Sequence, residues 1–293
     1  MPKSPTLIQT LVPNVDPDAR ERAGSYLRLA DFLLPGWITG FYMVGSAALD
    51  EYRPGKSDVD FVAVVTHRPS RGELKRLRRL HVLAGAGSGW RSAVRGRSPF
   101  SGTVNGVFVL EEDLQLPVTR IPPVASHVGG HFMVGRGFDV NPVVWHVLAE
   151  RGIAIRGAAT ASLGLDPEPG VLRDWNLQNL NSYWSRWARS TMSLGLPGRV
   201  ATAIPRSRIR MVAWGVLGAP RLHCAIATRE IVGKAAAGEY ALATFESRWH
   251  PLITAALAYW RGERRAGLPG RAVQGAGEFV LEVVDRANKL STP

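Results

Sequence analysis

The sequence predicts a two-domain protein: an α/β domain with a mixed sheet flanked by helices, followed by an all-α helical bundle domain. Short apolar runs alternate with amphipathic stretches in the first half, and amphipathic helical patterns follow one another in the second half. Between them, residues 157–170 are rich in glycine, proline and small residues. We therefore expect domains at residues 1–158 and 159–293, which the length of the chain allows.

Local signals define the elements of the first domain. Asp16 and Pro17 mark a helix start, Pro35 marks a helix end, and Ser70 with Glu73 forms a capping box. Apolar runs indicate the strands. The expected helices are residues 16–34, a helix that begins at 70, and 141–152, and the expected strands are residues 38–44, 59–65, 104–110 and 153–156.

Five amphipathic patterns in the second domain predict five helices, enough for a bundle. Trp184 and Trp187, on the first of them, are three residues apart and share a face. They either pack in the core, which we favour, or form an aromatic wall that contacts a substrate. The expected helices are residues 172–192, 206–227, 234–245, 251–260 and 272–290.

Composition limits the class of protein. No stretch reaches the roughly 18 consecutive apolar residues of a membrane span, and the start of the sequence lacks a signal-type apolar segment. We expect a cytoplasmic protein with no membrane partner. Cys224 is the single cysteine, which excludes an internal disulfide, and its apolar neighbours favour a buried packing role over a nucleophilic one.

The formal net charge of +12 predicts a surface that attracts polyanions. Arginines recur at residues 68–79, 91–97 and 199–210, but the aromatic signature of an RNA-binding module does not accompany them. We therefore favour a solvated basic face over nucleic-acid binding. Action on RNA is the weaker alternative, and it predicts binding that falls steeply with salt.

One segment carries a chemical pattern: a strand, a glycine-serine turn, and a second strand that begins with two acids. Gly45 lets a phosphate approach the backbone, and Ser46 offers its hydroxyl and amides to phosphate oxygens. Asp58 and Asp60 are two residues apart on a strand, so their side chains point to the same face. Two such carboxylates form a hard oxygen site for Mg²⁺ and suit nucleotidyl transfer. If they only capped a turn, two acids would begin a buried strand without a compensating cation.

The stretch GSAALDEYRPGKSDVDFVAVV, residues 45–65, resembles the signature of the nucleotidyltransferase superfamily. It is most similar to that of the aminoglycoside adenylyltransferases, which modify streptomycin and spectinomycin. Residues 141–145, 181–184 and 227–253 continue the similarity. The resemblance implies transfer of a nucleoside monophosphate, AMP from Mg²⁺-ATP, to a hydroxyl of a small molecule. An aminoglycoside is the candidate acceptor that the family suggests, and antibiotic resistance is the corresponding role.

The same resemblance implies roles for individual residues. Ser46 and Ser57 match the phosphate-contacting serines of the family, and Asp58 and Asp60 match its metal ligands. Lys234 matches the lysine of the helical domain that reaches the triphosphate, which suits a compact positive charge. Without the resemblance, Lys234 would be taken for an exposed surface lysine.

The chain departs from the family pattern at several positions. Asn105 stands where the family has its general base, and an amide does not accept a proton near neutral pH. The family's cleft acid falls on Asn141, which also fits a helix N-cap, and its nucleotide-side tyrosine falls near Tyr259 or Trp260. Glu239 is a hypothetical replacement base. The candidate substrate contacts are Asn141, Trp184, Trp187 and Glu239.

The sequence is compatible with two alternative functions. The chain is an adenylyltransferase in which Asn105 is tolerated, or it is a nucleotide-binding protein with degenerate or no transferase activity. Because a cationic acceptor needs an acidic cleft, the asparagines at two acidic family positions leave the acceptor unidentified. We expect a monomer.

Overall fold

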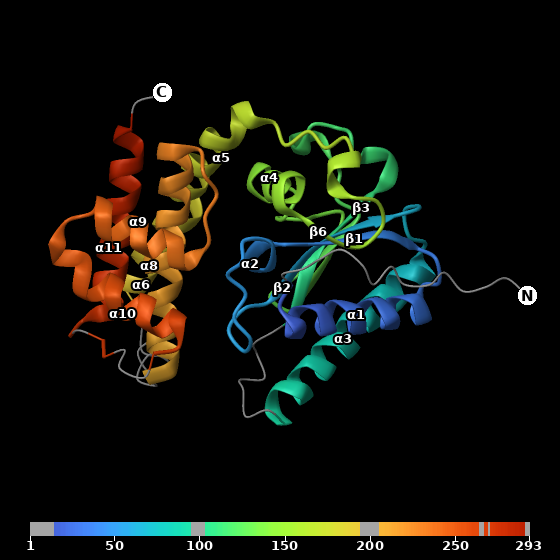
Figure 1. Ribbon diagram of the computed structural model, residues 1–293, viewed down its shortest axis with the longest axis horizontal. Helices are drawn as coiled ribbons and strands as arrows, with labels where there is room; N and C mark the ends of the chain where they lie inside the picture. The colour runs from blue at the N-terminus through green and yellow to red at the C-terminus, as the bar shows by residue number, and fades with distance from the viewer. Residues whose placement is uncertain (1–14, 95–102, 194–204, 264–266, 269, 291–293) are drawn as a thin grey trace, which may run out of the picture. The chain divides into compact units, whose positions relative to one another are not determined.

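The computed structural model describes residues 15–94, 103–193, 205–263, 267–268 and 270–290 (Figure 1). Two compact units divide the chain. The first comprises Met1–Glu111, Pro123–Gly137 and Glu150–Leu163, and the second comprises Glu112–Pro122, Phe138–Ala149 and Gly164–Pro293. Because the chain passes from one unit to the other more than once, the expected single boundary after residue 158 stays a prediction.

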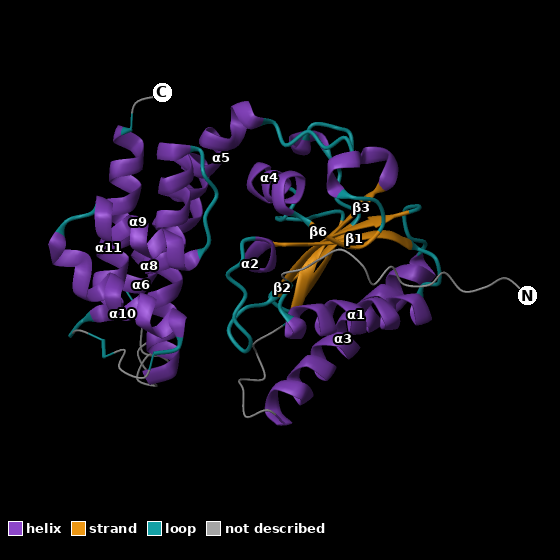
Figure 2. Ribbon diagram, in the orientation of Figure 1, coloured by secondary structure: helices purple, strands orange, loops and turns teal. Residues whose placement is uncertain are grey.

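The first unit is built on a six-stranded mixed sheet (Figure 2). Its strand order is β5-β4-β3-β2-β1-β6, and only β2 and β3 are parallel. A parallel pair needs a crossover connection, which the long helix α3 provides. The strands are β1(Ile38–Val44), β2(Val59–Val65), β3(Val104–Leu110), β4(Ala125–Val128), β5(His131–Val134) and β6(Ile153–Arg156).

Helices α1(Pro17–Leu33) and α3(Arg71–Val94) cover one face of this sheet (Figure 1). The Asp16 carboxylate accepts a hydrogen bond from the Asp18 amide and caps α1. Aromatic rings fill the layer between helices and sheet: Tyr26 of α1 meets Phe61 of β2 with 5.2 Å between ring centroids. This core explains why the strands read as continuous apolar runs, since both faces of the sheet's centre are buried.

The side-chain alternation of the strands decides which residues face away from α1 and α3. Phe61 and Phe108 belong to the core under these helices. Asp60 and Asn105, each an odd number of residues away, therefore project from the opposite face. The same register pairs Asp60 with Asn105 across the two parallel strands.

The sequence predictions for residues 1–158 hold in four strands and three helices, whose bounds agree within a few residues. The hairpin β4–β5 is an addition that the apolar pattern did not indicate, because its strands are short and partly polar. Its turn is Gly129-Gly130, and both residues have positive φ (58° and 81°), which suits the two-residue turns of hairpins.

The second unit is helical. Its apolar side chains form one core, in which helices α6, α8, α10 and α11 meet. The predicted helix over residues 172–192 contains a π-helical segment, Leu180–Trp184, between two α-helical parts. The helices are α4(Pro142–Arg151), most of which lies in this unit, α5(Leu172–Asn179), α6(Ser185–Met192), α8(Pro205–Thr228), α9(Lys234–Thr244), α10(His250–Arg261) and α11(Ala272–Lys289).

Among the helices described in the structure, none is long and apolar enough to cross a membrane. Cys224 is buried in α8 as a free thiol, and burial raises its pKa above the ordinary value, which opposes a nucleophilic role.

Candidate active site

The ends of the three central strands bring the motif residues together. Val44, the last residue of β1, pairs with Asp60 near the start of β2, and Asp60 pairs with Asn105 near the start of β3. Gly45 and Ser46 follow Val44 and begin the short helix α2(Gly45–Ala48). The glycine-serine turn, the two acids and Asn105 therefore lie at one end of the sheet.

Gly45 and the carboxylate of Asp60 are in close contact. Gly45 has a φ of 58°, and a Cβ atom there would overlap the Asp60 carboxylate. Glycine is required at this position for two reasons: it adopts the left-handed conformation readily, and it has no Cβ atom to overlap the Asp60 carboxylate. Helix α2 is a single turn of four residues, so its dipole is small, and phosphate binding here relies on the hydroxyl and amides of Ser46.

Asp58 and Ser57 also stabilise the loop that carries them. The Thr103 amide donates to Asp58 Oδ1 at 2.9 Å, and the Val59 amide donates to the Thr103 carbonyl at 2.8 Å. The buried Ser57 hydroxyl accepts a hydrogen bond from the Arg53 amide at 3.0 Å. One oxygen of Asp58 is therefore engaged in aligning β2 with β3, and its orientation is fixed before any ligand binds.

The side-chain oxygen of Asn105 has no hydrogen-bond partner in the structure. Its side chain is 7% exposed, and its Oδ1 atom is buried without a hydrogen-bond partner in the structure. A buried acceptor without a donor or cation costs free energy, about 1–3 kcal/mol. Beside Asp60, this oxygen fits a hard cation or a donating hydroxyl. The part of the chain that the structure describes contains no group of three or more His, Cys, Asp or Glu side chains that could hold a metal ion. The candidate oxygen ligands at this site are therefore the carboxylates of Asp58 and Asp60 and the amide oxygen of Asn105.

A neighbouring carboxylate does not replace Asn105 from its own strand. Glu111 follows the far end of β3, and its Oε2 atom accepts a hydrogen bond from the Thr39 hydroxyl at 3.3 Å. Six residues of extended strand separate it from Asn105, about 20 Å along the chain.

Lys234 lies at the first position of α9 in the second unit. Its side chain is half-buried, and its Nζ atom lies 4.3 Å from the ring centroid of Trp260 and 5.3 Å from that of Trp214. A cation at a helix N-terminus opposes the helix dipole, whereas an anion there is favoured. The aromatic contacts hold the ammonium group at this otherwise unfavourable place.

Two candidate substrate contacts have structural partners. Asn141 is buried and caps α4: its Oδ1 accepts from the Val144 amide at 3.0 Å, and its Nδ2 donates to the Phe138 carbonyl at 2.8 Å. This is the N-cap role named from the sequence. Glu239 is exposed on α9 and forms an ion pair with Arg261.

The two tryptophans of the predicted aromatic wall both pack on the core of the second unit, to different depths. Trp184 is 6% exposed and belongs to the core of the second unit, whereas Trp187 is half-buried. The structure therefore supports packing for Trp184.

Two features escaped the sequence reading. Trp214 and Tyr183 are exposed (46% and 42%) and hydrogen-bonded to each other, although no spacing in the sequence connects them. Asp139, just before α4, has its pKa raised to about 6 by burial. The sequence offered no signal for this shift, because burial of a loop acid depends on distant packing.

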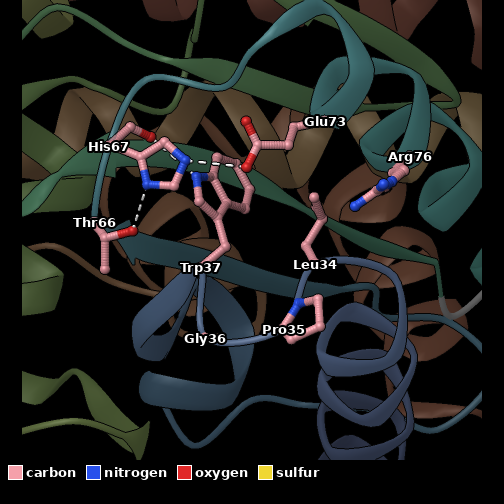
Figure 3. Close-up of a pocket in the computed structure, with 8 residues that line it drawn as sticks. All are labelled: Leu34, Pro35, Gly36, Trp37, Thr66, His67, Glu73 and Arg76. Atoms are coloured by element: carbon pink, nitrogen blue, oxygen red, sulfur yellow. Dashed lines mark hydrogen bonds and ion pairs between the residues drawn. The ribbon is translucent and has the colours of Figure 1, made fainter.

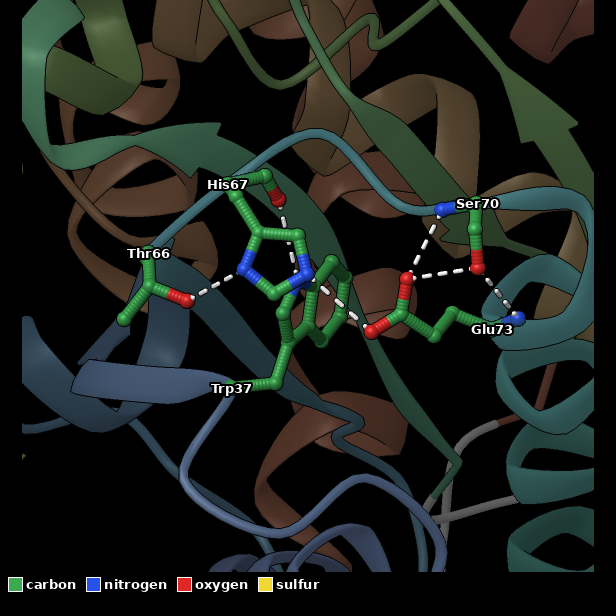
Figure 4. Close-up of polar contacts among 5 residues, drawn as sticks. All are labelled: Trp37, Thr66, His67, Ser70 and Glu73. Carbon is green, nitrogen blue, oxygen red and sulfur yellow. Dashed lines mark hydrogen bonds and ion pairs between the residues drawn. The ribbon is translucent and has the colours of Figure 1, made fainter.

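A shallow pocket of about 230 Å³ lies at the opposite end of β2 and contains none of the predicted site residues (Figure 3). Its polar groups pair with one another (Figure 4). His67 Nε2 and Glu73 Oε1 are 3.0 Å apart, and Thr66 Oγ1 is 2.8 Å from His67 Nδ1. The indole Nε1 of Trp37 donates to the His67 carbonyl at 2.9 Å.

Comparisons with known proteins agree with this arrangement. A nucleotidyltransferase domain model matches residues 27–100, and a model of the C-terminal domain of the aminoglycoside adenylyltransferases matches residues 206–286. No curated protein matches the sequence at a significant level.

The structure is similar in fold to a spectinomycin adenyltransferase from Enterococcus faecialis that was solved with ATP and spectinomycin. The TM-score is 0.65 and the sequence identity is 13%, over 90% of this chain and 98% of that one. The solved structure shows the same fold, and the two domain models, which match in the expected order, identify the protein as an aminoglycoside adenylyltransferase-like nucleotidyltransferase.

Proposed function

We propose that the chain transfers AMP from Mg²⁺-ATP to a hydroxyl group of a small molecule of the aminoglycoside class. The observation that carries this proposal is the grouping of Asp58, Asp60 and the unpartnered Oδ1 of Asn105 beside the Gly45–Ser46 turn. The solved adenyltransferase of similar fold contained ATP and spectinomycin, which supports the choice of donor and acceptor.

Each residue has a distinct task in the proposed reaction. Asp58 and Asp60 hold Mg²⁺, whose chemistry when bound is to offset the charge of the phosphates. Ser46 and Ser57 orient phosphate oxygens through hydroxyl and amide donors. Lys234 offers a positive charge to the triphosphate, as the family resemblance implies.

Asn105 orients the acceptor but does not take its proton. Its Oδ1 atom accepts a hydrogen bond from the acceptor hydroxyl, whose oxygen then forms a bond to the α-phosphorus while the bond to the bridging oxygen breaks and pyrophosphate leaves. The hydroxyl proton passes to solvent, because an amide is not a base near neutral pH. The absence of a positioned base lowers the rate about 10²- to 10⁴-fold relative to an enzyme with a carboxylate there.

The test is pyrophosphate release from ATP and Mg²⁺ across a panel of aminoglycosides. We expect release with at least one acceptor, and loss of that release in Asp58→Asn, which keeps the oxygen that accepts from the Thr103 amide. Full activity in Asp58→Asn would contradict the proposed role of the acids.

The second candidate is a nucleotide-binding protein without transferase activity, which Asn105 favours. It predicts Mg²⁺-dependent ATP binding and no pyrophosphate release with any acceptor. Asn105→Asp separates the two cases, because release that appears only in this variant indicates a degenerate enzyme.

We further propose that the protein acts as a monomer in the cytoplasm. Light scattering during size-exclusion chromatography tests the oligomeric state, for which the sequence mass is 31.9 kDa. A mass near twice that value would contradict it.

A further inference from the structure

The loop between α2 and β2 joins the two serines of the candidate site. Ser46 precedes this loop, and Ser57 lies near its end. The Glu51 amide donates a hydrogen bond to the Ser46 carbonyl at 2.9 Å. The Arg53 amide donates to the Ser57 hydroxyl at 3.0 Å, and the Ser57 amide donates to the Arg53 carbonyl at 2.9 Å. Each serine is therefore bonded to a residue directly next to Tyr52.

Tyr52 connects this loop to the start of α1 (Figure 1). Its hydroxyl donates to Asp18 Oδ2 at 3.0 Å, and its side chain packs against the core of the first unit. The same oxygen of Asp18 accepts from Arg22 Nε at 2.8 Å, and these two side chains are 11% and 2% exposed. Asp18 lies in the first turn of α1, where the helix dipole favours its negative charge. Burial, and after it the charge of Asp18, raises the pKa of Tyr52 above its ordinary value, so its hydroxyl stays a donor.

The backbone of the loop needs support from outside the loop. Asp50 and Gly55, on either side of Tyr52, have positive φ (57° and 82°). A residue other than glycine adopts this conformation at a cost in free energy, which contacts elsewhere must offset. The hydrogen bond between Tyr52 and Asp18 is such a contact, because it ties the middle of the loop to a helix.

We propose that Tyr52 is a positioning residue that fixes Ser46 and Ser57 for the phosphates of the nucleotide. This inference rests on the proposed function, in which both serines orient phosphate oxygens. Because the Ser57 hydroxyl accepts from the Arg53 amide, its own hydrogen is left to donate to a phosphate oxygen. In this role Tyr52 acts through the backbone on either side of it, and contact with the nucleotide is not required.

The test is Tyr52→Phe, which removes the anchoring hydroxyl and keeps the ring. Calorimetric titration with Mg²⁺-ATP, without an acceptor, should show about 10-fold weaker binding, because the loop then spends less time in the arrangement that binds phosphate. The KM for ATP should rise with the Kd. At saturating ATP, kcat should stay within about twofold of wild type, since the acids and Asn105 are untouched.

Tyr26→Phe is the matched control. Tyr26 lies on α1 and is 2% exposed, and its hydroxyl has no hydrogen-bond partner among the residues that the structure describes. This variant also loses one buried hydroxyl of the first unit and should bind ATP as wild type does.

Hydrogen exchange gives a readout that does not depend on activity. The amides of Lys56 and Ser57, which both donate to the Arg53 carbonyl at 2.9 Å, should exchange faster in Tyr52→Phe. Amides of the central strands should keep their protection. A substitution that only lowered the stability of the fold would accelerate exchange in both places.

Three results would overturn the positioning role. They are unchanged ATP binding in Tyr52→Phe; weaker binding without faster exchange in the loop; and equal weakening in Tyr26→Phe. Asp18→Ala, which removes the acceptor of the bond in place of its donor, is the second variant and should also weaken ATP. Tyr52→Phe should have no further effect in that background, and an additive effect would contradict the proposed route through Asp18.

Binding and turnover together separate this inference from the proposed function. Pyrophosphate release by the wild type, with equal ATP affinity in Tyr52→Phe, would refute the positioning role and keep the transferase. Weaker ATP binding in Tyr52→Phe, without release for any acceptor, would keep the positioning role and favour the nucleotide-binding protein. A wild-type chain that does not bind Mg²⁺-ATP would refute both.

Discussion

Polar side chains lie at both ends of β2, but the two groups differ in how their hydrogen bonds are satisfied. At the far end, Glu73 accepts from the amide and hydroxyl of Ser70 at 2.8 and 2.7 Å and also contacts His67. At the near end, Asp60 stands against Gly45 and beside Asn105, whose Oδ1 atom is buried without a partner.

The difference separates two uses of polar groups. Groups that complete each other's hydrogen bonds stabilise the fold without a ligand. The polar residues of the pocket at the far end therefore cap the start of α3. A buried polar group that is left incomplete costs stability, and beside two carboxylates a bound cation or hydroxyl would complete it. Substitutions at the near end should therefore change activity more than stability, and those at the far end should do the reverse.

The largest effect is expected for Asp60→Asn. This change removes a charge that the proposed reaction uses, so pyrophosphate release should fall by about 10²- to 10³-fold or more. The melting temperature should stay the same or rise, since like charges at the site are relieved. Glu111→Gln, a carboxylate at the other end of the sheet, is the matched control and should keep full activity. A large stability loss in Asp60→Asn with retained activity would reverse the comparison.

Gly45→Ala should reduce both activity and stability. The alanine must adopt a φ of 58° and also displaces the Asp60 carboxylate. The conformational part costs about 1–2 kcal/mol. Gly129→Ala isolates this part, because Gly129 has the same φ of 58° and open space around it. We expect denaturant unfolding to show the greater loss for Gly45→Ala, and pyrophosphate release to fall only in that variant. Equal stability losses would show that the contact with Asp60 is unimportant.

Asn105→Asp should increase activity, in contrast to the two preceding substitutions at the near end. A carboxylate beside Asp60 supplies the missing base, so release should rise about 10²-fold or more and decline at acid pH as the new group protonates. Without Mg²⁺, the added negative charge should lower the melting temperature, and Mg²⁺ should restore it. A pH–rate profile and thermal melts with and without Mg²⁺ measure both effects. An unchanged rate would mean that the proton leaves without help from this position.

The smallest effect is expected for Glu73→Gln. Loss of the capping carboxylate should destabilise the protein by about 1 kcal/mol and leave pyrophosphate release unchanged. Hydrogen bonds from Ser70 lower the pKa of Glu73 from its ordinary 4.5 to about 2. Its contribution is therefore complete above pH 4.5 and is lost as the pH falls towards 2. Urea unfolding at pH 7 and pH 3 should show a smaller difference between variant and wild type at pH 3; an equal difference would exclude this linkage.

The pattern of apolar residues along the sequence predicted the buried strands of the sheet. Strands β1, β2 and β3 were found at their expected bounds because buried strands read as uninterrupted apolar runs. Hairpin β4–β5 was missed, since His131 and Val134 are exposed and the strand carries no alternation strong enough to read.

The candidate site was predictable where the chemistry is local and unpredictable where it depends on packing. The Gly45–Ser46 turn and the acids are adjacent in sequence or one strand apart, so their motif was legible. The unpartnered oxygen of Asn105 and the bond between Trp214 and Tyr183 arise between distant segments. Burial of Trp184 agrees with the packing role that the sequence favoured, whereas the π-helical turn was not predicted, because nothing in the sequence distinguishes it from an α-helical turn.

The π-helical turn determines how this helix would respond to the deletion of one residue. The Ser185 amide donates to the Leu180 carbonyl five residues earlier, so the helix from Leu172 to Met192 contains one residue more than regular winding requires. Deleting one residue there would convert the π-turn to regular α-helix and would leave the parts before and after it on nearly the same faces, because the π-turn absorbs the extra residue. Such a deletion would change only the turn that carries Tyr183, so it would remove Tyr183 from its place beside Trp214 in a chain that still folds.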